Sequence, residues 1–464
     1  MSEFYLGIDL GTSSVKAILK SLDGQSHKVR CGYTDKTPDG WMNAVAEAIK
    51  ELKGKVDEKI AAVGFSSQVG TYIVNGKEVI GWQENVGRQE LDYIKSSVCD
   101  EEFLEEISML HPDLISYPLP RLLYIKKHFG NGCEVLMPKD LLVRELTGNS
   151  VTDVFSMRGL AAPDTCKLSE KLLEIFDISH RLPELKKPFD LAGYVTEKAS
   201  EKYGLDKGTP VYLGCNDFFA GLLGMGICDV GDAFDLSGTS EHIGYISDSI
   251  NPNGFVSGKY FNGFCTYGGT KSSGNSCSFA MDSFGLDGVS PESCLKPDTP
   301  IFLPYLNGER APIFDENARG TYFGIGQGCD KKALAYATLE GVVFSLWDIA
   351  QSMKMPHPTR LVCGGGSAND LTMNTLRASL FECELLQVEE NDTSALGACI
   401  ISMVGHGAFG SIKEAVKACV KYKGTVLPDT RYTELLRARF EIYREIYKDL
   451  KGTFKKFNDL KETY

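Results

Sequence analysis

The feature that most constrains the fold of this chain is a short motif that occurs twice. Asp9-Leu-Gly-Thr-Ser-Ser near the N-terminus is echoed by Asp235-Leu-Ser-Gly-Thr-Ser in the middle of the sequence. Each copy follows one apolar run and precedes another, which is typical of two strands joined by a tip of small residues. We call residues 9–14 the first tip and residues 235–240 the second tip. Two such hairpins favour a duplicated fold whose halves share one nucleotide.

The first tip carries the chemistry of a phosphate site. Small residues there let backbone N–H groups close on a phosphate, and two hydroxyls add donors. Asp9 would hold a magnesium ion through water, and Lys16 would add a positive charge. A plain hairpin is the alternative for an isolated D-x-G-T, but the repeat disfavours it. We therefore predict metal binding at Asp9 and nucleotide binding at Gly11, Thr12, Ser13 and Lys16.

A second candidate centre lies just before the second tip. Residues 211–213 predict a buried strand, residues 214–217 a turn, and residues 218–228 an apolar helix of small residues. This order places Asp217 at a strand-to-helix junction. An acidic side chain there can simply cap the orphan amides of the first helical turn. The alternative is a functional carboxylate, which the neighbouring second tip supports.

Two further stretches are candidates for contact with a sugar. Residues 60–65 predict a strand that ends in Ser66-Ser67-Gln68-Val69-Gly70, and ligands bind beyond the carboxyl ends of strands in open α/β sheets. Gln68 is therefore a candidate, although a loop amide without a partner is commoner. Trp82 and Arg88 offer an aromatic face and a charge of the kind that carbohydrate sites use, or an interface tryptophan beside a surface ion pair.

A glycine run in the second half is a candidate for an adenine site. Residues 361–363 predict a strand, and Gly364-Gly365-Gly366-Ser-Ala-Asn369 follows before the next helix. Three glycines permit a flat ligand to lie against the backbone. A bare helix-entry turn is the alternative. We predict nucleotide binding at Gly364, Gly365, Gly366 and Asn369.

Composition excludes several other classes of protein. A chain of 464 residues should form two or three domains, and its net charge of −13 argues against nucleic-acid binding. The sequence shows no signal peptide and no apolar run long enough to span a membrane. Fourteen cysteines occur without a C-x-x-C pair, which disfavours structural zinc and is typical of reduced thiols in the cytoplasm. P-loop and dinucleotide glycine motifs are missing from the sequence.

Together these stretches make the chain resemble the FGGY family of carbohydrate kinases, part of the superfamily of actin, sugar kinases and heat-shock chaperones. The resemblance covers nearly the whole chain, and the motifs stand in the family's order. They are Gly7-Ile-Asp-Leu-Gly-Thr-Ser-Ser-Val-Lys-Ala, Pro138-Lys-Asp with Leu146-Thr-Gly, Gly214-Cys-Asn-Asp217, Gly238-Thr-Ser240, Pro304-Tyr-Leu-Asn-Gly-Glu-Arg-Ala-Pro, Ala318-Arg-Gly, Glu340-Gly341, Gly364-Gly-Gly and Ser394-Ala-Leu-Gly-Ala398.

This resemblance implies an α/β fold of two ribonuclease-H-like (actin-like ATPase) domains with a nucleotide and sugar cleft between them. We place the sugar site and the first phosphate motif in residues 1–244, and adenosine binding in residues 245–464. The implied reaction transfers the γ-phosphoryl group of ATP, with Mg²⁺, to a hydroxyl of a xylulose-like ketose or a polyol. Asp217 would be the catalytic base, and helix-end donors would keep it ionised with a low pKa.

The resemblance also implies further ligand contacts. Sugar-binding residues would be Gln68, Trp82, Arg88, Asn216, Asp217 and Phe218. Gly238 and Thr239 would join the residues that bind nucleotide. The chain departs from its relatives at Gln68-Val69-Gly70, where glycerol kinases have Gln-Arg-Glu and xylulokinases have Gln-Met-His-Gly. Phe218 stands where glutamine is common. These departures disfavour glycerol and leave the sugar open.

Two rival functions share the same core. One is a sugar sensor that keeps the kinase fold without turnover, and the other is a nucleotide-driven actin-type or chaperone-type ATPase. The sequence has no separate β-rich peptide-binding domain, which disfavours the chaperone. The expected partners are a small sugar and MgATP, with a possible homodimer and neither nucleic acid nor membrane.

Overall fold

The computed structural model describes residues 3–110, 114–238 and 240–463. Its contacts divide the chain into two compact units, and neither unit is one continuous stretch. Unit 1 comprises Met1–Cys228, Gly258–Asn262 and Asp392–Val420, and unit 2 comprises Asp229–Ser257, Gly263–Asn391 and Lys421–Tyr464. A single division between residues 244 and 245 does not reproduce these units, because a late segment of the chain returns to unit 1.

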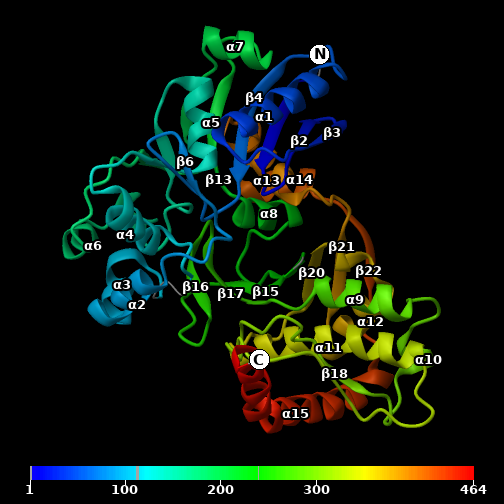
Figure 1. Ribbon diagram of the computed structural model, residues 1–464. Helices are drawn as coiled ribbons and strands as arrows, with labels where there is room; N and C mark the ends of the chain where they lie inside the picture. The colour runs from blue at the N-terminus through cyan, green and yellow to red at the C-terminus, as the bar shows by residue number, and fades with distance from the viewer. Residues whose placement is uncertain (1–2, 111–113, 239, 464) are drawn as a thin grey trace. The chain divides into compact units, whose positions relative to one another are not determined.

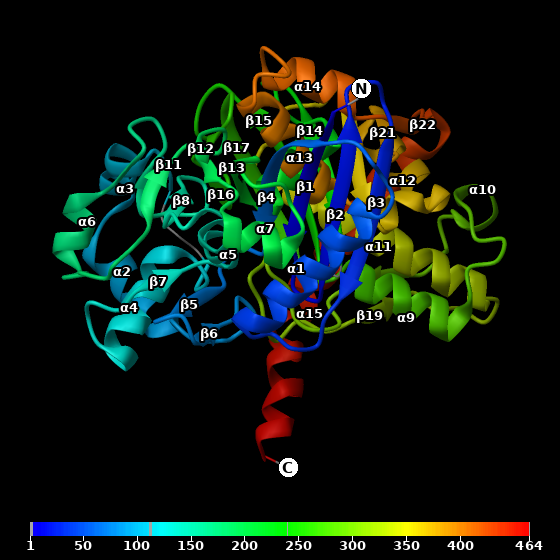
Figure 2. The same cartoon turned by 90° about the horizontal axis from the view of Figure 1, so that it is seen from above.

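Unit 1 is built on a six-stranded sheet. Its strands, in spatial order, are β12 (Leu191–Tyr194), β13 (Pro210–Asn216), β4 (Ile60–Ser67), β1 (Phe4–Leu10), β2 (Ser14–Ser21) and β3 (Ser26–Gly32). The first three strands along the chain form an antiparallel meander, visible side by side in Figure 2, while β1, β4 and β13 are parallel. Every residue of β1 is buried, as expected for a central strand covered on both faces.

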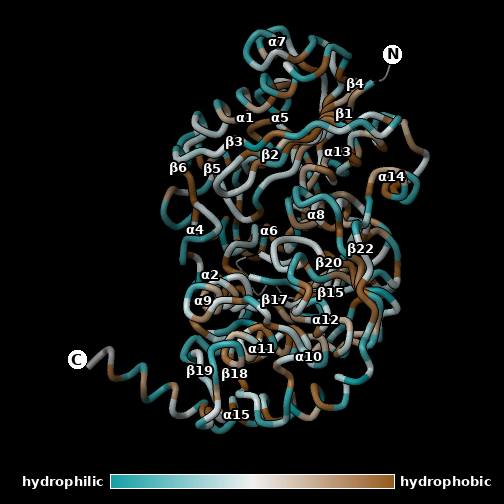
Figure 3. Tube along the Cα trace, turned by 90° about the vertical axis from the view of Figure 1, so that its right-hand side faces the viewer, coloured by the Kyte–Doolittle hydropathy of each residue, from teal (hydrophilic) through white to brown (hydrophobic). Residues whose placement is uncertain are grey.

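Helices cover both faces of this sheet. Alternate side chains of β1 pack with α1 (Pro38–Lys53), α5 (Pro138–Thr147) and α7 (Glu197–Tyr203), and hydrophobic segments gather along β1 and its neighbours in Figure 3. The other face carries α8 (Asp217–Met225) and α13 (Thr393–Gly405). A Cβ added at Gly7 would lie 2.1 Å from the Ala395 carbonyl oxygen, and one at Gly397 would lie 1.8 Å from that of Ala220. Glycine therefore permits the close approach of α13 to both β1 and α8.

The other elements of unit 1 lie outside the six-stranded sheet. They are α2 (Arg88–Ser97), α3 (Asp100–Ile107), α4 (Pro118–Phe129), α6 (Glu170–Ile175), α14 (Ile412–Cys419), β5 (Tyr72–Val74), β6 (Glu78–Ile80), β7 (Val135–Leu136), β8 (Val151–Asp153), β9 (Ala161–Ala162), β10 (Lys167–Leu168) and β11 (Glu184–Lys186).

A seven-stranded sheet carries unit 2. Its strands, in spatial order, are β16 (Val256–Tyr260), β17 (Gly263–Thr270), β15 (Glu241–Ser247), β14 (Ala233–Ser237), β20 (Arg360–Gly365), β21 (Glu384–Val388) and β22 (Tyr422–Val426). The run β17-β15-β14-β20-β21 repeats the order and directions of β3-β2-β1-β4-β13. The two hairpins thus begin two copies of one topology, which confirms the duplicated α/β fold.

The longest buried helix of unit 2 is α11 (Lys331–Ser352). Figure 1 shows it among α9 (Gly274–Phe284), α12 (Leu371–Phe381) and α15 (Thr430–Thr463), and contacts join it to all three. By length and composition α11 could cross a membrane, but 83% of its apolar window is buried, so it is a core helix. The remaining elements are α10 (Pro291–Cys294), β18 (Ile301–Leu303), β19 (Thr321–Phe323) and the 3₁₀ turn η1 (Ser367–Asn369).

Candidate active site

Asp9, the predicted metal ligand, is the penultimate residue of β1 and only 1% exposed. Its Oδ1 accepts a hydrogen bond from Ser66 Oγ at 2.7 Å, and its Oδ2 accepts one from Ser394 Oγ at 2.7 Å. Lys16 Nζ lies 3.4 Å from Oδ2. Asp9 is therefore a buried carboxylate in unit 1 that two hydroxyl groups hold in place.

Sequence reasoning did not single out the two serines that hold Asp9. Ser66 is the parallel-strand partner of Asp9 in the pairing of β1 with β4. The sequence did hint at Ser66, because it is one of the polar residues at the end of the strand formed by residues 60–67. Ser394 lies in the first turn of α13, inside a motif whose role the sequence did not reveal. Only the return of this segment to unit 1 brings Ser394 to Asp9.

Asp217 is the first residue of α8, and it does not cap the helix. The cap is Asn216, whose Oδ1 accepts a hydrogen bond from the Phe219 backbone N–H at 2.9 Å. The Asn216 Nδ2 donates to the Phe155 carbonyl oxygen at 3.2 Å. The capping alternative thus applies to Asn216 rather than to Asp217. Because both ends of the Asn216 amide already have partners in the protein, its contact with a sugar stays a prediction.

Burial and the negative charge of Asp9 raise the pKa of Asp217 to about 7, although hydrogen bonds from the backbone of Phe218 and Val69 lower it. The low pKa expected from helix-end donors is therefore wrong. Desolvation of the Asp217 carboxylate, together with repulsion from the Asp9 carboxylate, outweighs those donors. The Val69 contact also brings the loop of residues 68–70 to Asp217.

The predicted sugar contacts in unit 1 differ in their burial and in their partners. Gln68 is buried, and its backbone N–H donates to the Leu10 carbonyl oxygen at 3.0 Å. Trp82 is 41% exposed, and its Nε1–H donates to Thr12 Oγ1 at 3.1 Å. Of the other two predicted contacts, Phe218 is half-buried and Arg88 is exposed at the start of α2.

The first tip is a closed turn in which the side chains of Thr12 and Ser13 are accessible. The Gly11 N–H donates to the Ser14 carbonyl oxygen at 3.1 Å, and the Tyr33 hydroxyl donates to the Gly11 carbonyl oxygen. Thr12 is half-buried and Ser13 is exposed. This geometry leaves both hydroxyl groups at the surface of unit 1, where a phosphate could accept hydrogen bonds from them.

The predicted nucleotide residues of unit 2 lie together at the ends of two parallel strands. Ser237 of β14 pairs with Gly365 of β20, so Gly238 follows directly beside the glycine run. Gly365 has a φ of +84°, and a Cβ there would lie 1.9 Å from the Ser237 carbonyl oxygen, so the position requires glycine. Asn369 is exposed and donates to the Gly366 carbonyl oxygen at 3.3 Å. Thr239 lies outside the described residues.

Beneath these glycines lies a buried charge network that the sequence did not reveal. Arg377, which is fully buried, places Nε 2.7 Å from Asp235 Oδ2 and Nη2 2.5 Å from Glu241 Oε1. The Ser367 Oγ donates to Glu241 at 2.9 Å. Burial and the Glu241 charge raise the pKa of the Asp235 carboxyl well above its usual range, against the effect of Arg377. The network ties β14, β15 and α12 together.

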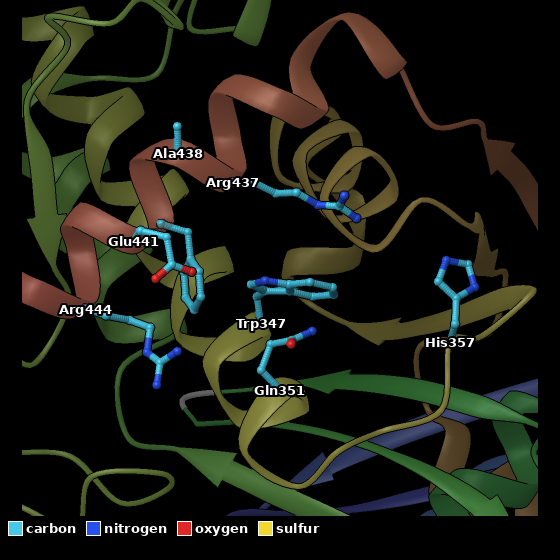
Figure 4. A pocket seen from close by; sticks show the side chains of 8 residues that line it. Trp347, Gln351, His357, Arg437, Ala438, Glu441 and Arg444 are labelled. Carbon is cyan, nitrogen blue, oxygen red and sulfur yellow. The ribbon is translucent and has the colours of Figure 1, made fainter.

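A surface pocket of about 560 Å³ in unit 2 contains none of the predicted site residues. Figure 4 shows Trp347 of α11 between Arg437 and Arg444 of α15. Arg437 is already paired with Glu382, and Arg444 lies 3.5 Å from Asp348. Unit 1 therefore holds one group of candidate residues, namely the first tip, the serines that hold Asp9, and Asp217. Unit 2 holds another group, namely Gly238 and the glycine run.

Models of one protein family match both halves of the chain. Residues 4–224 match the N-terminal domain model of the FGGY family of carbohydrate kinases, and residues 238–406 match its C-terminal domain model. The two models together account for most of the chain.

Relatives that align with this chain over nearly their whole length are named as two kinds of sugar kinase. The chain is 29% identical to a xylulose kinase from Lactococcus lactis, over 98% of this chain and 99% of that protein. It is 25% identical to a gluconokinase from Bacillus subtilis, over 93% of each. The solved structure of a ligand-bound xylulose kinase from Lactobacillus acidophilus has the same fold, with a TM-score of 0.86 at 24% identity over 98% of this chain and 100% of that one. The chain belongs to the FGGY family of carbohydrate kinases and is an ATP-dependent sugar kinase.

Proposed function

We propose that this kinase transfers the γ-phosphoryl group of MgATP to a hydroxyl of a ketose such as xylulose, with Asp217 as the general base. The observation that carries the proposal is the carboxylate of Asp217, which begins α8 beside Asp9 and has its pKa raised to about 7. A base titrating near neutral pH combines an ionised fraction with useful basicity. Perturbed carboxylates of this kind cluster at functional sites.

Asp9 suits Mg²⁺ because of the groups around it. Mg²⁺ usually keeps several waters and binds one or two carboxylates together with substrate phosphates, rather than a full protein cage. Among the described residues no three His, Cys, Asp or Glu side chains gather into a metal cage, and Asp9 offers one fixed carboxylate. The bound ion would neutralise charge that develops on the phosphates.

The protein side chains then divide the work of transfer between them. Asp217 accepts the proton of the attacking sugar hydroxyl, and its hydrogen bonds from the backbone of Phe218 and Val69 fix its orientation. Thr12 and Ser13 donate to phosphate oxygens, and Lys16 adds positive charge beside Asp9. In a loose phosphoryl-transfer transition state, positioning and charge neutralisation supply most of the catalysis.

The adenosine end of the nucleotide is assigned to unit 2. Gly238, Gly364, Gly365 and Gly366 lie together on the β14 and β20 ends, and Gly365 tolerates no side chain. A surface of bare backbone is what a flat base packs against. Thr239 keeps its predicted role beside Gly238 without a structural description.

The choice of a ketose rests on two observations. The relatives of matching length include proteins named xylulose kinase and gluconokinase. The loop Gln68-Val69-Gly70 has no charged pair to orient a small triol. We therefore expect a five- or six-carbon open-chain sugar to be preferred over glycerol.

A panel of acceptors tests this proposal. The purified kinase is assayed with MgATP and with D-xylulose, D-ribulose, D-fructose, D-gluconate and glycerol, and kcat/KM is compared. D-Xylulose should give the largest value and glycerol the smallest. Glycerol as the best substrate would refute the sugar assignment, and gluconate as the best would replace a ketose by a sugar acid. Sugar binding by calorimetry without turnover would identify a sensor instead of an enzyme.

The surroundings of the protein are also part of the proposal. All fourteen cysteines are free thiols, and most of them are buried, as in proteins of reducing compartments. This supports the cytoplasm as the site of action. The homodimer and the exclusion of nucleic acid and membrane partners stay predictions.

A further inference from the structure

Trp82 is exposed, yet several hydrogen bonds hold the turn in which it lies. The Gly81 N–H donates to the Glu84 side chain at 2.6 Å, and the Glu84 N–H donates back to the Gly81 carbonyl oxygen at 3.1 Å. The Trp82 N–H donates to Thr71 Oγ1 at 3.2 Å. The indole ring itself is 41% exposed. The turn of residues 81–84 thus holds an aromatic face toward solvent in a fixed position.

A buried arginine anchors the same turn from below. Arg121 of α4 is fully buried, and its Nη2 donates to the carbonyl oxygens of Gly81 at 3.2 Å and Glu84 at 2.9 Å. Burying a guanidinium is costly unless it is hydrogen-bonded, and here its bonds go to the backbone on both sides of Trp82. A surface tryptophan with only a packing role does not need such an anchor.

The indole N–H of Trp82 ends on the first tip. Nε1 donates to Thr12 Oγ1 at 3.1 Å, although the two residues are far apart in the sequence. An indole N–H can only donate, so the Thr12 oxygen must be the acceptor in this bond. A threonine hydroxyl has one proton and two lone pairs. Once one lone pair is used, the proton of Thr12 is directed away from Trp82 and is free to bond to a phosphate oxygen.

We propose that Trp82 is a positioning residue that couples the sugar site to the phosphate site: its indole N–H orients the Thr12 hydroxyl toward the nucleotide, while its exposed face receives the sugar. This inference rests on the proposed function, in which Thr12 contacts phosphate and Trp82 contacts the sugar. A sugar packed on the ring would restrain the indole, and the restrained indole would hold Thr12 in its donating orientation. Nucleotide affinity then depends on a residue of the sugar site.

A double-mutant cycle measures this coupling. The affinity of the full-length protein for a nonhydrolysable ATP analogue with Mg²⁺ is measured by calorimetry, without sugar, for Trp82→Phe, Thr12→Val and the double variant. Phenylalanine keeps an aromatic face and removes only the donor. Each single variant should bind about three- to tenfold more weakly, the usual worth of one hydrogen bond. In the Thr12→Val background, Trp82→Phe should have no further effect, because its target hydroxyl is gone.

Thr12→Ser supplies the matched control, since serine keeps the hydroxyl. In that background Trp82→Phe should again weaken binding severalfold. Losses that simply add in the double variant, or a Trp82→Phe variant that binds nucleotide as tightly as the wild type, would overturn the proposal. Trp82 is partly exposed, so the phenylalanine variant should fold, and a thermal melt checks this.

Tryptophan fluorescence gives a second readout that a merely structural role would not move. The chain has three tryptophans, of which Trp41 is buried in unit 1 and Trp347 lies in unit 2. Adding the ATP analogue should change the emission of the wild type and of Trp347→Phe, but not that of Trp82→Phe. A change that survives in full in Trp82→Phe would contradict the proposal.

Steady-state kinetics separates this inference from the proposed function. With D-xylulose as the probe sugar, Trp82→Phe should raise the KM for ATP severalfold. Because coupling between two sites is reciprocal, this variant should also raise the KM for D-xylulose at saturating ATP. Failure of D-xylulose as a substrate would refute the sugar assignment while leaving the nucleotide cycle valid. An additive cycle in an active xylulose kinase would refute the coupling alone.

Discussion

The two tips have nearly the same sequence, yet the structure surrounds their aspartates differently. Asp9 in the first tip receives hydrogen bonds from two serine hydroxyls and has Lys16 3.4 Å away. Asp235 in the second tip lies 2.7 Å from the buried guanidinium of Arg377. The duplicated fold has therefore kept a carboxylate at each hairpin. The cation nearest to Asp9 is the part-exposed Lys16, whereas the cation nearest to Asp235 is the fully buried Arg377.

This difference assigns different roles to equivalent positions. A carboxylate held by neutral hydroxyls keeps its negative charge available to an external cation, and it also raises the pKa of Asp217. A carboxylate that faces Arg377 and Glu241 belongs to an internal network that ties a hairpin to a helix. We infer that Asp9 of the first tip serves the chemistry, whereas Asp235 of the second tip is structural and lies beneath the residues assigned to nucleotide binding. Four experiments test this contrast.

The largest effect is expected at Asp217, the proposed base, whose pKa Asp9 of the first tip helps to raise. Asp217→Asn should fold normally and still bind nucleotide, because Asn216 rather than Asp217 caps α8. Its turnover number should fall by roughly 10²- to 10⁴-fold, the usual worth of a positioned base. The measurement is kcat under saturating MgATP and sugar. A fall of less than about tenfold would remove Asp217 from catalysis.

Matched substitutions of the two tip aspartates test the contrast directly. Asp9→Asn should lower kcat by roughly 10²- to 10³-fold, as expected when one electrostatic partner of the reacting phosphates is lost, and should raise the Mg²⁺ concentration needed for half-maximal rate. Asp235→Asn should leave kcat within about tenfold of the wild type. Both variants are assayed over a magnesium titration. Equal losses of turnover in the two would break the distinction between the tips.

The cations beside the two aspartates should differ in their contribution to stability. Arg377→Met should lower the free energy of unfolding by about 3–5 kcal/mol, because it leaves the buried Asp235 and Glu241 without their cation. Lys16→Met is the matched control and should cost at most about 1 kcal/mol, since its ion pair is part-exposed and long. Urea unfolding measures both. Similar losses would show that the two environments are alike.

The smallest effect concerns pH. With a pKa of about 7, Asp217 is mostly protonated below neutral pH in the free enzyme. Because kcat/KM reports the groups of the free enzyme, kcat/KM should rise with pH and level off above 7, with about a tenfold loss at pH 6. The sign for stability is opposite. Because an unfolded aspartate titrates near ~3.9, the folded state binds the extra proton between about pH 4 and 7, so this group favours the folded state less as pH rises through that window.

Asp217→Asn is the control for the pH experiment. It should remove this part of the pH dependence of stability, while the Asp235 network keeps its own. A kcat/KM that stays flat from pH 5.5 to 8 in the wild type would contradict the raised pKa, and with it the effect of Asp9 on Asp217.

Local pattern was enough to predict the hairpins and the strand before Asp217. The two strands expected on either side of the first tip correspond to β1 (Phe4–Leu10) and β2 (Ser14–Ser21), and Asp217 follows the end of β13 as expected. These features follow from apolar runs, small turn residues and a cap, which are properties of neighbouring residues. The duplicated topology followed from the repeat of one motif.

The groups that tune the site could not be predicted in this way. Ser394 reaches Asp9 only because the chain comes back to unit 1, and Arg377 meets Asp235 across β14 and α12. The pKa of Asp217 depends on burial and on Asp9, which no local spacing reveals. Helix-end donors were visible in the sequence, but the stronger desolvation was not. Each miss is a contact between segments distant in sequence.

The late return of α13 to unit 1 also has a consequence for how the protein is made. A chain is synthesised from its N-terminus, and domains generally fold as units during synthesis. Here β1 leaves the ribosome long before Thr393–Gly405. Until then Asp9 lacks its hydrogen bond from Ser394, and Gly7 lacks its contact with Ala395. A fragment that stops before α13 therefore cannot finish its own active centre. Catalytic competence arrives only after α13 has been synthesised.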